Sequence, residues 1–197
     1  MNIFLKFKLP KIPIILNYTY LHYQIGLTML CGIGIKTSKT ILSLVKSPEN
    51  FFCCSTTELK DILGLSEKII RKLNRSKALE KADVIIKQHN TLGVKSVFIQ
   101  DENYPLRLKE CSDAPIMLYY KGELDLNHGK FVAIVGMRDA SSYGKRICHA
   151  LIKQFQGKGI SVVSGLAHGI DTYAHEYCLQ YDVPTIAVFG HGHDKVY

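Results

Sequence analysis

The sequence predicts an α/β protein in which a doubly wound parallel sheet is preceded by a small all-helical domain. After Leu92, three apolar runs, FVAIV (131–135), ISVVS (160–164) and TIAVF (185–189), alternate with helical segments. Near-continuous apolar runs are typical of strands buried on both faces, and strand–helix alternation with short loops predicts parallel strands joined by right-handed crossovers. Residues 18–90 instead show apolar residues at helical spacing, which indicates helices alone.

The all-helical region is expected to contain several short helices. Residues 18–30 suit one helix, which CGIG (31–34) ends. Residues 35–45 suit a second, whose apolar face at helical spacing consists of Ser38, Ile41, Leu42 and Val45. SPENFFCCS (47–55) reads as a loop. A short helix then has Thr56 or Thr57 as its N-cap and Gly64 as its end, and a longer basic helix begins at Ser66.

The second region adds two short β-rich runs, VKSVFI (94–99) and PIMLYY (115–120), before the three buried strands. The helix that begins near Ser142 is expected to bury Ile147, Ala150, Leu151 and Phe155. The helix that follows ISVVS is expected to bury Ile170, Ala174, Tyr177, Cys178 and Tyr181. We therefore divide the chain into an N-terminal extension (1–17), a helical domain (18–90) and a sheet domain (92–197).

Charge and cysteine usage narrow the class of protein. The formal net charge of +8 is uneven, because residues 1–100 carry +9 and the remainder carries −1. The basic half suggests nucleic acid or another anionic partner, or else a solvated basic face with no partner. The 6 cysteines include no C-x-x-C pair, so we expect reduced thiols in a cytoplasmic protein and no zinc site. The N-terminal apolar runs are short and broken by Lys and Pro, which predicts neither a signal peptide nor a membrane segment.

Each of the three buried strands ends in a glycine-rich turn: VGMRDASSYG, SGLAHGID and FGHGHD. In an open α/β sheet the carboxyl ends of the strands form the binding crevice, so the three turns should lie together. Glycine lets the backbone approach a ligand closely, and two of the turns lead into helix N-termini, which attract anions. The turns therefore predict a phosphate site.

Arg138 is the cation that this site would use. It lies two residues beyond the turn's first glycine, where its planar guanidinium can bind a phosphate bidentately. Ser141, Ser142 and Tyr143 follow in the sequence and would add hydroxyl donors for the phosphate. An ion pair with Asp139 or Asp171 is the alternative role for Arg138. Because Gly136 to Gly144 is not a G-x-G-x-x-G motif, we expect no dinucleotide, and indeed no cofactor of any kind.

Four stretches taken together resemble the DprA/Smf family of DNA-processing proteins: YPLRLKECSDAPIMLYYKG, VAIVGMRDASSYGKR, VVSGLAHGIDTYAH and TIAVFGHGHDKVY. The resemblance extends over residues 22–197, since LTMLCGIGIKTSKTIL is similar to the family's SAM-like, helix-hairpin-helix-type domain. It implies an extended Rossmann-like domain that binds single-stranded DNA by its backbone. It also implies protection of that DNA, assistance in loading a RecA-type recombinase during natural transformation, and no catalysis.

The resemblance also assigns residues to the site. The first phosphate motif contains Gly136, Arg138, Ser141 and Gly144. The second contains Ser164, Gly165, Ala167, Gly169, Asp171 and His175, and the third contains Gly190, Gly192, Asp194 and Tyr197. Met137 stands where the family more often has Ser, and His191 and His193 also depart from the usual pattern.

The family's chains continue beyond the point where this one ends, with strands and helices that complete the sheet and carry a dimer interface. The resemblance therefore implies a truncated member, and a homodimer is expected of the full-length family and not of this chain. For the isolated 197 residues we expect low solubility, marginal stability and weak DNA binding, with the helical domain the most self-sufficient part.

Other functional interpretations stay open at this stage. Ser164, Asp171 and His175 could form a hydrolytic triad, although no G-x-S-x-G motif surrounds the serine. His191 and His193 could bind a metal, but no third ligand is evident, so we assign none. The fold would also suit a nucleotide-processing enzyme, such as a phosphoribohydrolase of the LOG type. Tyr143, Tyr173, Phe189 and Tyr197 are candidates for base stacking.

The helical domain has three open interpretations. Gly32 and Gly34 could place helix amides on a DNA phosphate, or they could form a plain turn. A basic set could extend the DNA track or form a solvated face: Lys68, Arg71, Lys72, Arg75, Lys77, Lys81 and Lys87. The domain could also act alone as a docking module for a protein partner.

Overall fold

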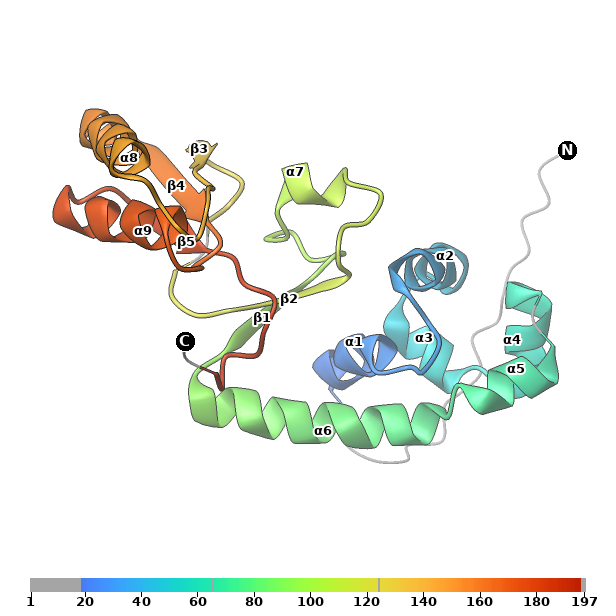
Figure 1. Cartoon of the computed structure of the whole chain (residues 1–197). Helices are drawn as coiled ribbons and strands as arrows, with labels where there is room; N and C mark the ends of the chain where they lie inside the picture. Colours follow the sequence, from blue (N-terminus) through green and yellow to red (C-terminus); the bar gives the residue numbers. More distant parts are fainter. Residues whose placement is uncertain (1–18, 65, 124, 196–197) are drawn as a thin grey trace, which may run out of the picture. The chain divides into compact units, whose positions relative to one another are not determined.

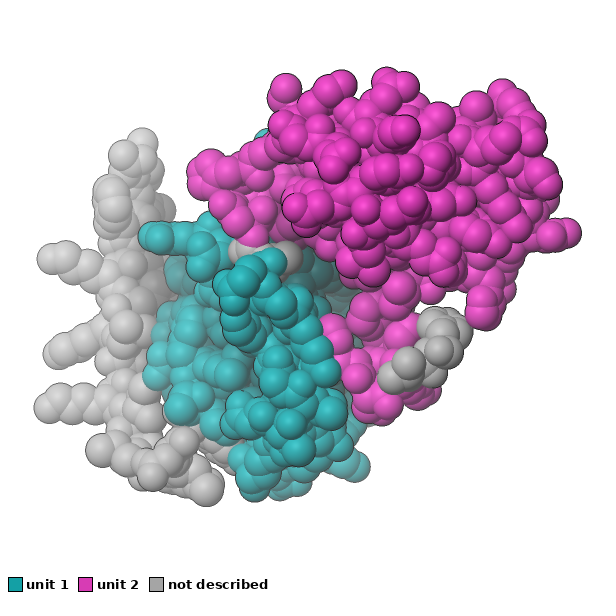
Figure 2. Space-filling view, turned by 90° about the vertical axis from the view of Figure 1, so that its left-hand side faces the viewer, with its two compact units in different colours: residues 1–124 teal, residues 125–197 magenta. Residues whose placement is uncertain are grey.

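The computed structural model describes residues 19–64, 66–123 and 125–195. The chain forms two compact units, unit 1 within residues 1–124 and unit 2 within residues 125–197 (Figures 1 and 2). The extension expected at residues 1–17 and the site residue Tyr197 lie outside the described residues. No helix within the described part of the chain is long and apolar enough to span a membrane.

Unit 1 begins with a cluster of helices around one core. The helices are α1 (Tyr20–Thr28), α2 (Ile35–Val45), α3 (Pro48–Cys53), α4 (Thr56–Leu63), α5 (Glu67–Lys72) and α6 (Arg75–Leu92). The face expected of the second helix is confirmed, since all of its predicted residues are buried: Ser38, Ile41, Leu42 and Val45. The long helix α6 packs against α1, and α3 packs against both α1 and α2 (Figure 1).

Local capping explains where these helices differ from the sequence expectation. The expected loop after Val45 contains α3, because Ser47 accepts a hydrogen bond from the Asn50 amide (3.2 Å) and Pro48 occupies the first helical position. Helix α4 is capped by Ser55, not by Thr56 or Thr57. Ser55 and Glu58 form a reciprocal capping box. Gly64 adopts φ 64° and ends the helix, as expected.

The expected long basic helix is interrupted at Asn74. This residue adopts φ 44°, and its side chain accepts a hydrogen bond from the Lys77 amide (3.2 Å), which starts α6 as a separate helix. The next residue, Arg75, turns inward and donates to the carbonyl oxygens of Phe51 (2.9 Å) and Phe52 (3.2 Å) at the end of α3. Arg75 is therefore a structural cap for α3 and does not belong to an exposed basic face.

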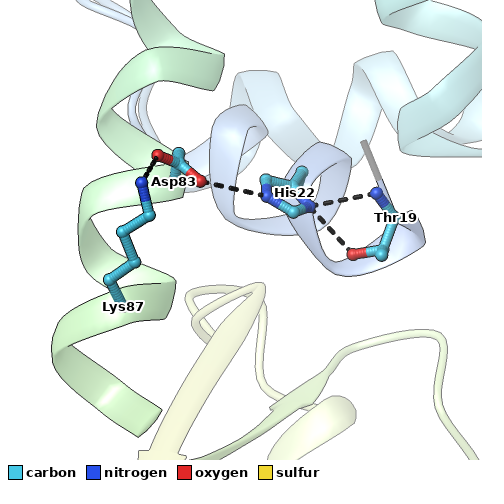
Figure 3. A network of polar contacts seen from close by, with 4 residues as sticks. All are labelled: Thr19, His22, Asp83 and Lys87. Carbon is cyan, nitrogen blue, oxygen red and sulfur yellow. Dashed lines mark hydrogen bonds and ion pairs between the residues drawn. The ribbon is translucent and has the colours of Figure 1, made fainter. Parts of the chain in front are cut away.

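A polar network joins the start of α1 to α6 (Figure 3). The Nδ1 atom of His22 accepts a hydrogen bond from the Thr19 amide (3.0 Å), and its Nε2 atom lies 3.7 Å from an Asp83 oxygen. Lys87 donates to the other Asp83 oxygen at 2.6 Å. Arg71 is similarly paired with Glu67 at 3.3 Å. These pairs reduce the free positive charge on the α5–α6 surface.

Unit 1 also contains the two β-rich runs that precede the parallel sheet. Strands β1 (Lys95–Phe98) and β2 (Met117–Tyr120) pair antiparallel, and α7 (Leu106–Lys109) lies between them in sequence. Val97, Phe98 and Met117 are buried in the same core as the helices. Hydrophobic packing therefore places residues 92–123 with unit 1, whereas the sequence division had grouped them with the parallel strands.

The described residues of unit 2 form a three-stranded parallel sheet with two helices. Strands β3 (Lys130–Ala133), β4 (Ile160–Ser164) and β5 (Thr185–Ala187) are adjacent in chain order, with α8 (Ser142–Phe155) and α9 (Ile170–Gln180) as the connections. Val132 is aligned with Val162, and Val162 with Thr185. The three parallel strands predicted from the apolar runs are confirmed.

Both helices of unit 2 pack on one face of its sheet. Cys148 and Ile152 from α8 share a core with Val162 of β4 and with Ala174 and Cys178 of α9. The predicted face of α9 is confirmed in part: Ala174 and Cys178 are buried, whereas Ile170, Tyr177 and Tyr181 are only partly buried. The predicted face of α8 is wrong: Ile147 and Leu151 are exposed. The described residues thus give an α/β unit with a parallel sheet, and helices on both faces stay a prediction.

Candidate functional site

The turns that follow β3 and β4 contact each other directly. The Ile170 amide, at the start of α9, donates to the Met137 carbonyl oxygen (3.2 Å) in the turn after β3. Gly169 precedes it with φ 86°, and a Cβ atom there would collide with the Met137 and Arg138 carbonyl oxygens. Only glycine combines this backbone conformation with so close an approach. The expected meeting of these two turns is confirmed.

Two further glycines fit against the same isoleucine. A Cβ atom on Gly136 would lie 2.6 Å from the Ile170 side chain, and one on Gly144 would lie 3.2 Å from it. Ser141 caps α8 by accepting a hydrogen bond from the Gly144 amide (3.1 Å). These three predicted site residues therefore shape the turn and fix the start of α8, which sets the position of Arg138.

A cavity of about 290 Å³ opens beside these turns. Arg138, Asp139 and Ala140 line it from the first turn, and Lys145 lines it from α8. The second turn and α9 supply the remaining lining residues: His168, Gly169, Thr172, Tyr173 and Glu176. Arg138 and Gly169 are the predicted site residues that line this cavity, and its use as a phosphate site stays a prediction.

Two cations and two carboxylates face this cavity. Arg138 is exposed and forms no ion pair with any residue in the described part of the chain, so the alternative pairing with Asp139 or Asp171 is absent. The Lys145 Nζ atom lies 4.5 Å from the centre of the Tyr173 ring. Interaction with the Tyr173 side chain raises the pKa of Lys145, so this amine is charged at neutral pH. Asp139 and Glu176 offset the positive charge, which favours a ligand with both anionic oxygens and hydrogen-bond donors.

The helix N-termini are less available for an anion than the sequence suggested. The first amide of α9 is already used by the Met137 carbonyl oxygen, and in α8 the amides of Gly144 and Lys145 bond to Ser141. Asp171 lies in the first turn of α9, where a carboxylate already compensates the helix dipole. The groups in the cavity that could attract an anion are therefore mainly the side chains of Arg138 and Lys145.

Ser164, Asp171 and His175 do not form a catalytic triad. The buried Ser164 hydroxyl donates to the Ile134 carbonyl oxygen (2.7 Å), and the His175 Nδ1 atom lies 2.8 Å from the Thr185 hydroxyl. Burial lowers the pKa of His175, and the Asp171 charge opposes that effect. Among the described residues no hydrogen bond joins Ser164 to His175, so this serine lacks a base.

Asp171 and its neighbour Thr172 instead contact the backbone of the second turn. One Asp171 oxygen would lie 2.7 Å from a Cβ atom on Gly165. The Ala167 carbonyl oxygen accepts hydrogen bonds from both the amide (3.1 Å) and the hydroxyl (2.8 Å) of Thr172. Between them, Leu166 adopts φ 56°, which is unusual for a branched residue and marks this turn as tightly constrained.

The third turn does not contribute to the cavity. Gly190, Gly192 and Asp194 are exposed and absent from its lining. In this turn the Phe189 ring stacks on His191, with centres 4.5 Å apart, and meets His193 edge-on at 5.1 Å.

Sequence reasoning did not select four of the polar lining residues: Lys145, His168, Thr172 and Glu176. Thr172 and Glu176 are spaced i, i+4 on α9 and share a face, which is a recognisable signal. Lys145 follows the glycine-rich turn by one residue, but nothing in the spacing distinguishes it from the neighbouring Arg146.

Comparison with known proteins identifies the family. The family model described as DNA recombination-mediator protein A matches residues 95–197, which is more than half of the chain. The DNA processing protein DprA of Streptococcus pneumoniae is 45% identical over 102 residues, which cover 52% of this chain and 36% of that protein. Protein Smf of Synechocystis is 29% identical over 179 residues, which cover 89% of this chain and 45% of that protein.

A solved structure supports the same relationship. The X-ray structure of DNA processing protein A from Streptococcus pneumoniae matches with a TM-score of 0.66 and 31% identity, over 92% of this chain and 61% of that one. The chain spans less than half the length of the two curated relatives described above. The family match contains all of the described unit 2 and both turns that line the cavity. The chain therefore belongs to the DprA/Smf family of DNA-processing proteins.

Proposed function

We propose that this chain takes part in DNA processing for recombination and binds single-stranded DNA by its phosphate backbone at the cavity of unit 2. The observation that carries the proposal is the exposed Arg138, which forms no ion pair with any described residue and lines the cavity with Lys145, within the region that the family model matches. Arg138 would hold a phosphate bidentately, and Lys145, held over Tyr173, would add a second charge.

In this proposal the protein binds DNA and catalyses no reaction. The engagement of Ser164 with a carbonyl oxygen and of His175 with Thr185 supports this, because neither side chain is then placed to act as nucleophile or base on a ligand. From the family resemblance we further propose that the bound DNA is protected and passed to a RecA-type recombinase in the cytoplasm, in natural transformation.

A second candidate is a nucleotide-processing enzyme of the LOG phosphoribohydrolase type. One observation favours it: Glu176 and Asp139 line the same cavity as Arg138, so a carboxylate and a phosphate-binding cation lie in one site. A carboxylate beside a bound nucleotide could act as a general base or stabilise a cationic transition state. In the DNA-binding proposal the same carboxylates only weaken the attraction of the cavity for phosphate.

A salt-titrated binding assay on an oligothymidylate tests the first candidate. We expect Arg138→Ala to weaken binding about tenfold or more, because a charge-assisted hydrogen bond contributes about 1.5–3 kcal/mol. The dependence of log affinity on log salt should fall by about 0.7, the value for one phosphate on a single strand. Lys153→Ala is the matched control, since Lys153 is an exposed cation of α8 outside the cavity. Unchanged affinity and slope in Arg138→Ala would remove Arg138 from the phosphate site.

Glu176→Gln separates the two candidates. If the cavity binds DNA, removal of this negative charge should strengthen oligonucleotide binding. If the cavity is an enzyme site, the unaltered protein should release base from a panel of nucleoside monophosphates, and Glu176→Gln should reduce that activity. Base release without oligonucleotide binding would favour the enzyme and contradict the DNA-binding proposal.

A further inference from the structure

Exposed apolar side chains occur in the turn after β3 and in the first half of α8, close in sequence to residues that line the cavity. Tyr143 is 66% exposed, Met137 is 74% exposed and Ile147 is 43% exposed. Tyr143 and Ile147 are one helical turn apart, and Met137 directly precedes Arg138. Exposed apolar side chains close in sequence to the exposed Arg138 suit a ligand that is apolar in one part and anionic in another. A nucleotide has this character.

We propose that Tyr143 is the platform on which a base of the bound strand stacks. The inference rests on the proposed binding of single-stranded DNA, and it deepens that proposal by assigning the contact to the bases. The Arg146 guanidinium carbon lies 5.9 Å from the centre of the Tyr143 ring, so the ring has a cation beside it. Base stacking on an aromatic ring is tolerant of sequence, and a neighbouring arginine adds to it.

The other aromatic rings near the turns already have partners within unit 2. Tyr173 stacks with Tyr177, their ring centres 6.1 Å apart. Phe189 has His191 and His193 against it. Tyr143 is distinguished from these rings by its exposure, since Tyr173 and Phe189 are half-buried.

The position of Tyr143 on α8 defines which nucleotide it contacts. Residues two apart on a helix point in different directions, so Tyr143 and Lys145 do not face the same side. Lys145 lines the cavity, whereas Tyr143 does not. We therefore expect the base on Tyr143 to belong to a different nucleotide from the one whose phosphate enters the cavity. We expect Tyr143 to affect the binding of an oligonucleotide and to leave the binding of a single nucleotide unchanged.

The absence of tryptophan from the sequence allows a direct test. In Tyr143→Trp, the new indole is the only tryptophan, and stacking of a base should quench its fluorescence. The two probes are a ten-residue oligothymidylate and an abasic strand of equal length with the same phosphates. We expect quenching by the oligothymidylate and little by the abasic strand. Tyr20→Trp is the control, because Tyr20 is an exposed tyrosine of unit 1.

Affinity measurements complete the test. Tyr143→Ala should weaken oligothymidylate binding about 5- to 150-fold, the equivalent of about 1–3 kcal/mol per stacked base, and should leave the affinity for the abasic strand unchanged. Equal weakening of both strands, or an unquenched Tyr143→Trp that still binds oligothymidylate, would overturn the stacking role. Failure of the unaltered protein to bind either strand would instead overturn the proposed DNA binding, so the two failures are distinguishable.

Discussion

The two units differ in what they bury. Unit 1 encloses large side chains completely, among them Phe51, Phe98 and Tyr104. The buried apolar residues in the described part of unit 2 are smaller: Cys148, Ile152, Val162, Ala174, Cys178 and Val183. Several large apolar side chains of unit 2 are exposed, including Val135, Met137, Tyr143 and Leu179. Unit 2, which carries the candidate site, therefore gains less stability from burial than unit 1.

This difference predicts separate unfolding of the two units. Because burial of apolar surface is the main favourable contribution to folding, unit 2 should unfold at a lower temperature than unit 1. The unit that supports the site is then the less stable one, and its exposed apolar side chains are available to a ligand. The predictions below test this comparison, beginning with the largest expected effect.

Truncation of the unit 2 core should abolish the lower transition alone. Ile152 is fully buried on α8, and Ile152→Ala should cost about 2–5 kcal/mol, a large fraction of the stability of a small unit. Differential scanning calorimetry should show loss of the lower transition and retention of the upper one. Leu151→Ala is the matched control, because the exposed Leu151 should change stability by no more than about 0.5 kcal/mol. A single transition that shifts as a whole would show that the units unfold together.

A pair of glycine substitutions separates backbone strain from close packing. Gly64 in unit 1 and Gly169 in unit 2 both have positive φ, 64° and 86°. No atom lies within 4 Å of a Cβ built on Gly64, whereas one on Gly169 would meet two carbonyl oxygens. Gly64→Ala should cost about 1–2 kcal/mol from the left-handed backbone alone. Gly169→Ala should cost a further amount of about 1–3 kcal/mol from overpacking.

Urea titration of each variant checks these values, and oligonucleotide binding gives a second readout. Gly169→Ala should weaken DNA binding, because the Met137–Arg138 backbone must move to admit the methyl group. Gly64→Ala should leave the affinity unchanged. Equal destabilisation by the two substitutions would mean that the turns of unit 2 do not need their close contact.

The sequence was informative where one physical effect determines the structure. The apolar runs predicted the three parallel strands. The glycine-rich turns predicted that three strand ends meet, and the turns after β3 and β4 do so beside the cavity that Arg138 lines, whereas the third turn does not line it. The prediction of which face of α8 is buried was wrong because this helix has apolar residues on adjacent faces. Periodicity alone does not say whether Ile147 or Cys148 is buried. The Asn74 break was missed because asparagine can cap a helix or continue it, and the choice depends on its left-handed backbone.

The composition of the site was only partly predictable for a related reason. Ser164 and Gly136 share the turns with Arg138, yet one forms an internal hydrogen bond and the other contacts Ile170. Residue type at a strand end indicates where a site lies. Whether a side chain faces the cavity or packs inside the protein depends on tertiary structure. Glu176 and Lys145 line the cavity, although sequence reasoning did not select them.

The smallest predicted effect is a difference in acid sensitivity between the units. In unit 2, burial lowers the pKa of His175 below its ordinary value of 6.5, against the opposing charge of Asp171. The unfolded chain then binds a proton near pH 6.5 that the folded unit does not bind. Stability is complete above this pH and decreases below it, by up to about 1.4 kcal/mol per pH unit until the folded unit also takes up the proton. In unit 1, hydrogen bonds from Ser55 lower the pKa of Glu58, so the corresponding loss begins only below about pH 4.5.

Calorimetric scans between pH 4 and 8 compare the two transitions directly. The lower transition should move to lower temperature as the pH falls below about 6.5, while the upper transition should stay constant until about pH 4.5. His175→Gln should flatten the response of the lower transition. Asp171→Asn should extend it to lower pH, because removal of the carboxylate lowers the folded pKa of His175 further. A lower transition in His175→Gln that still falls from pH 6.5 would assign the acid sensitivity to another group of unit 2.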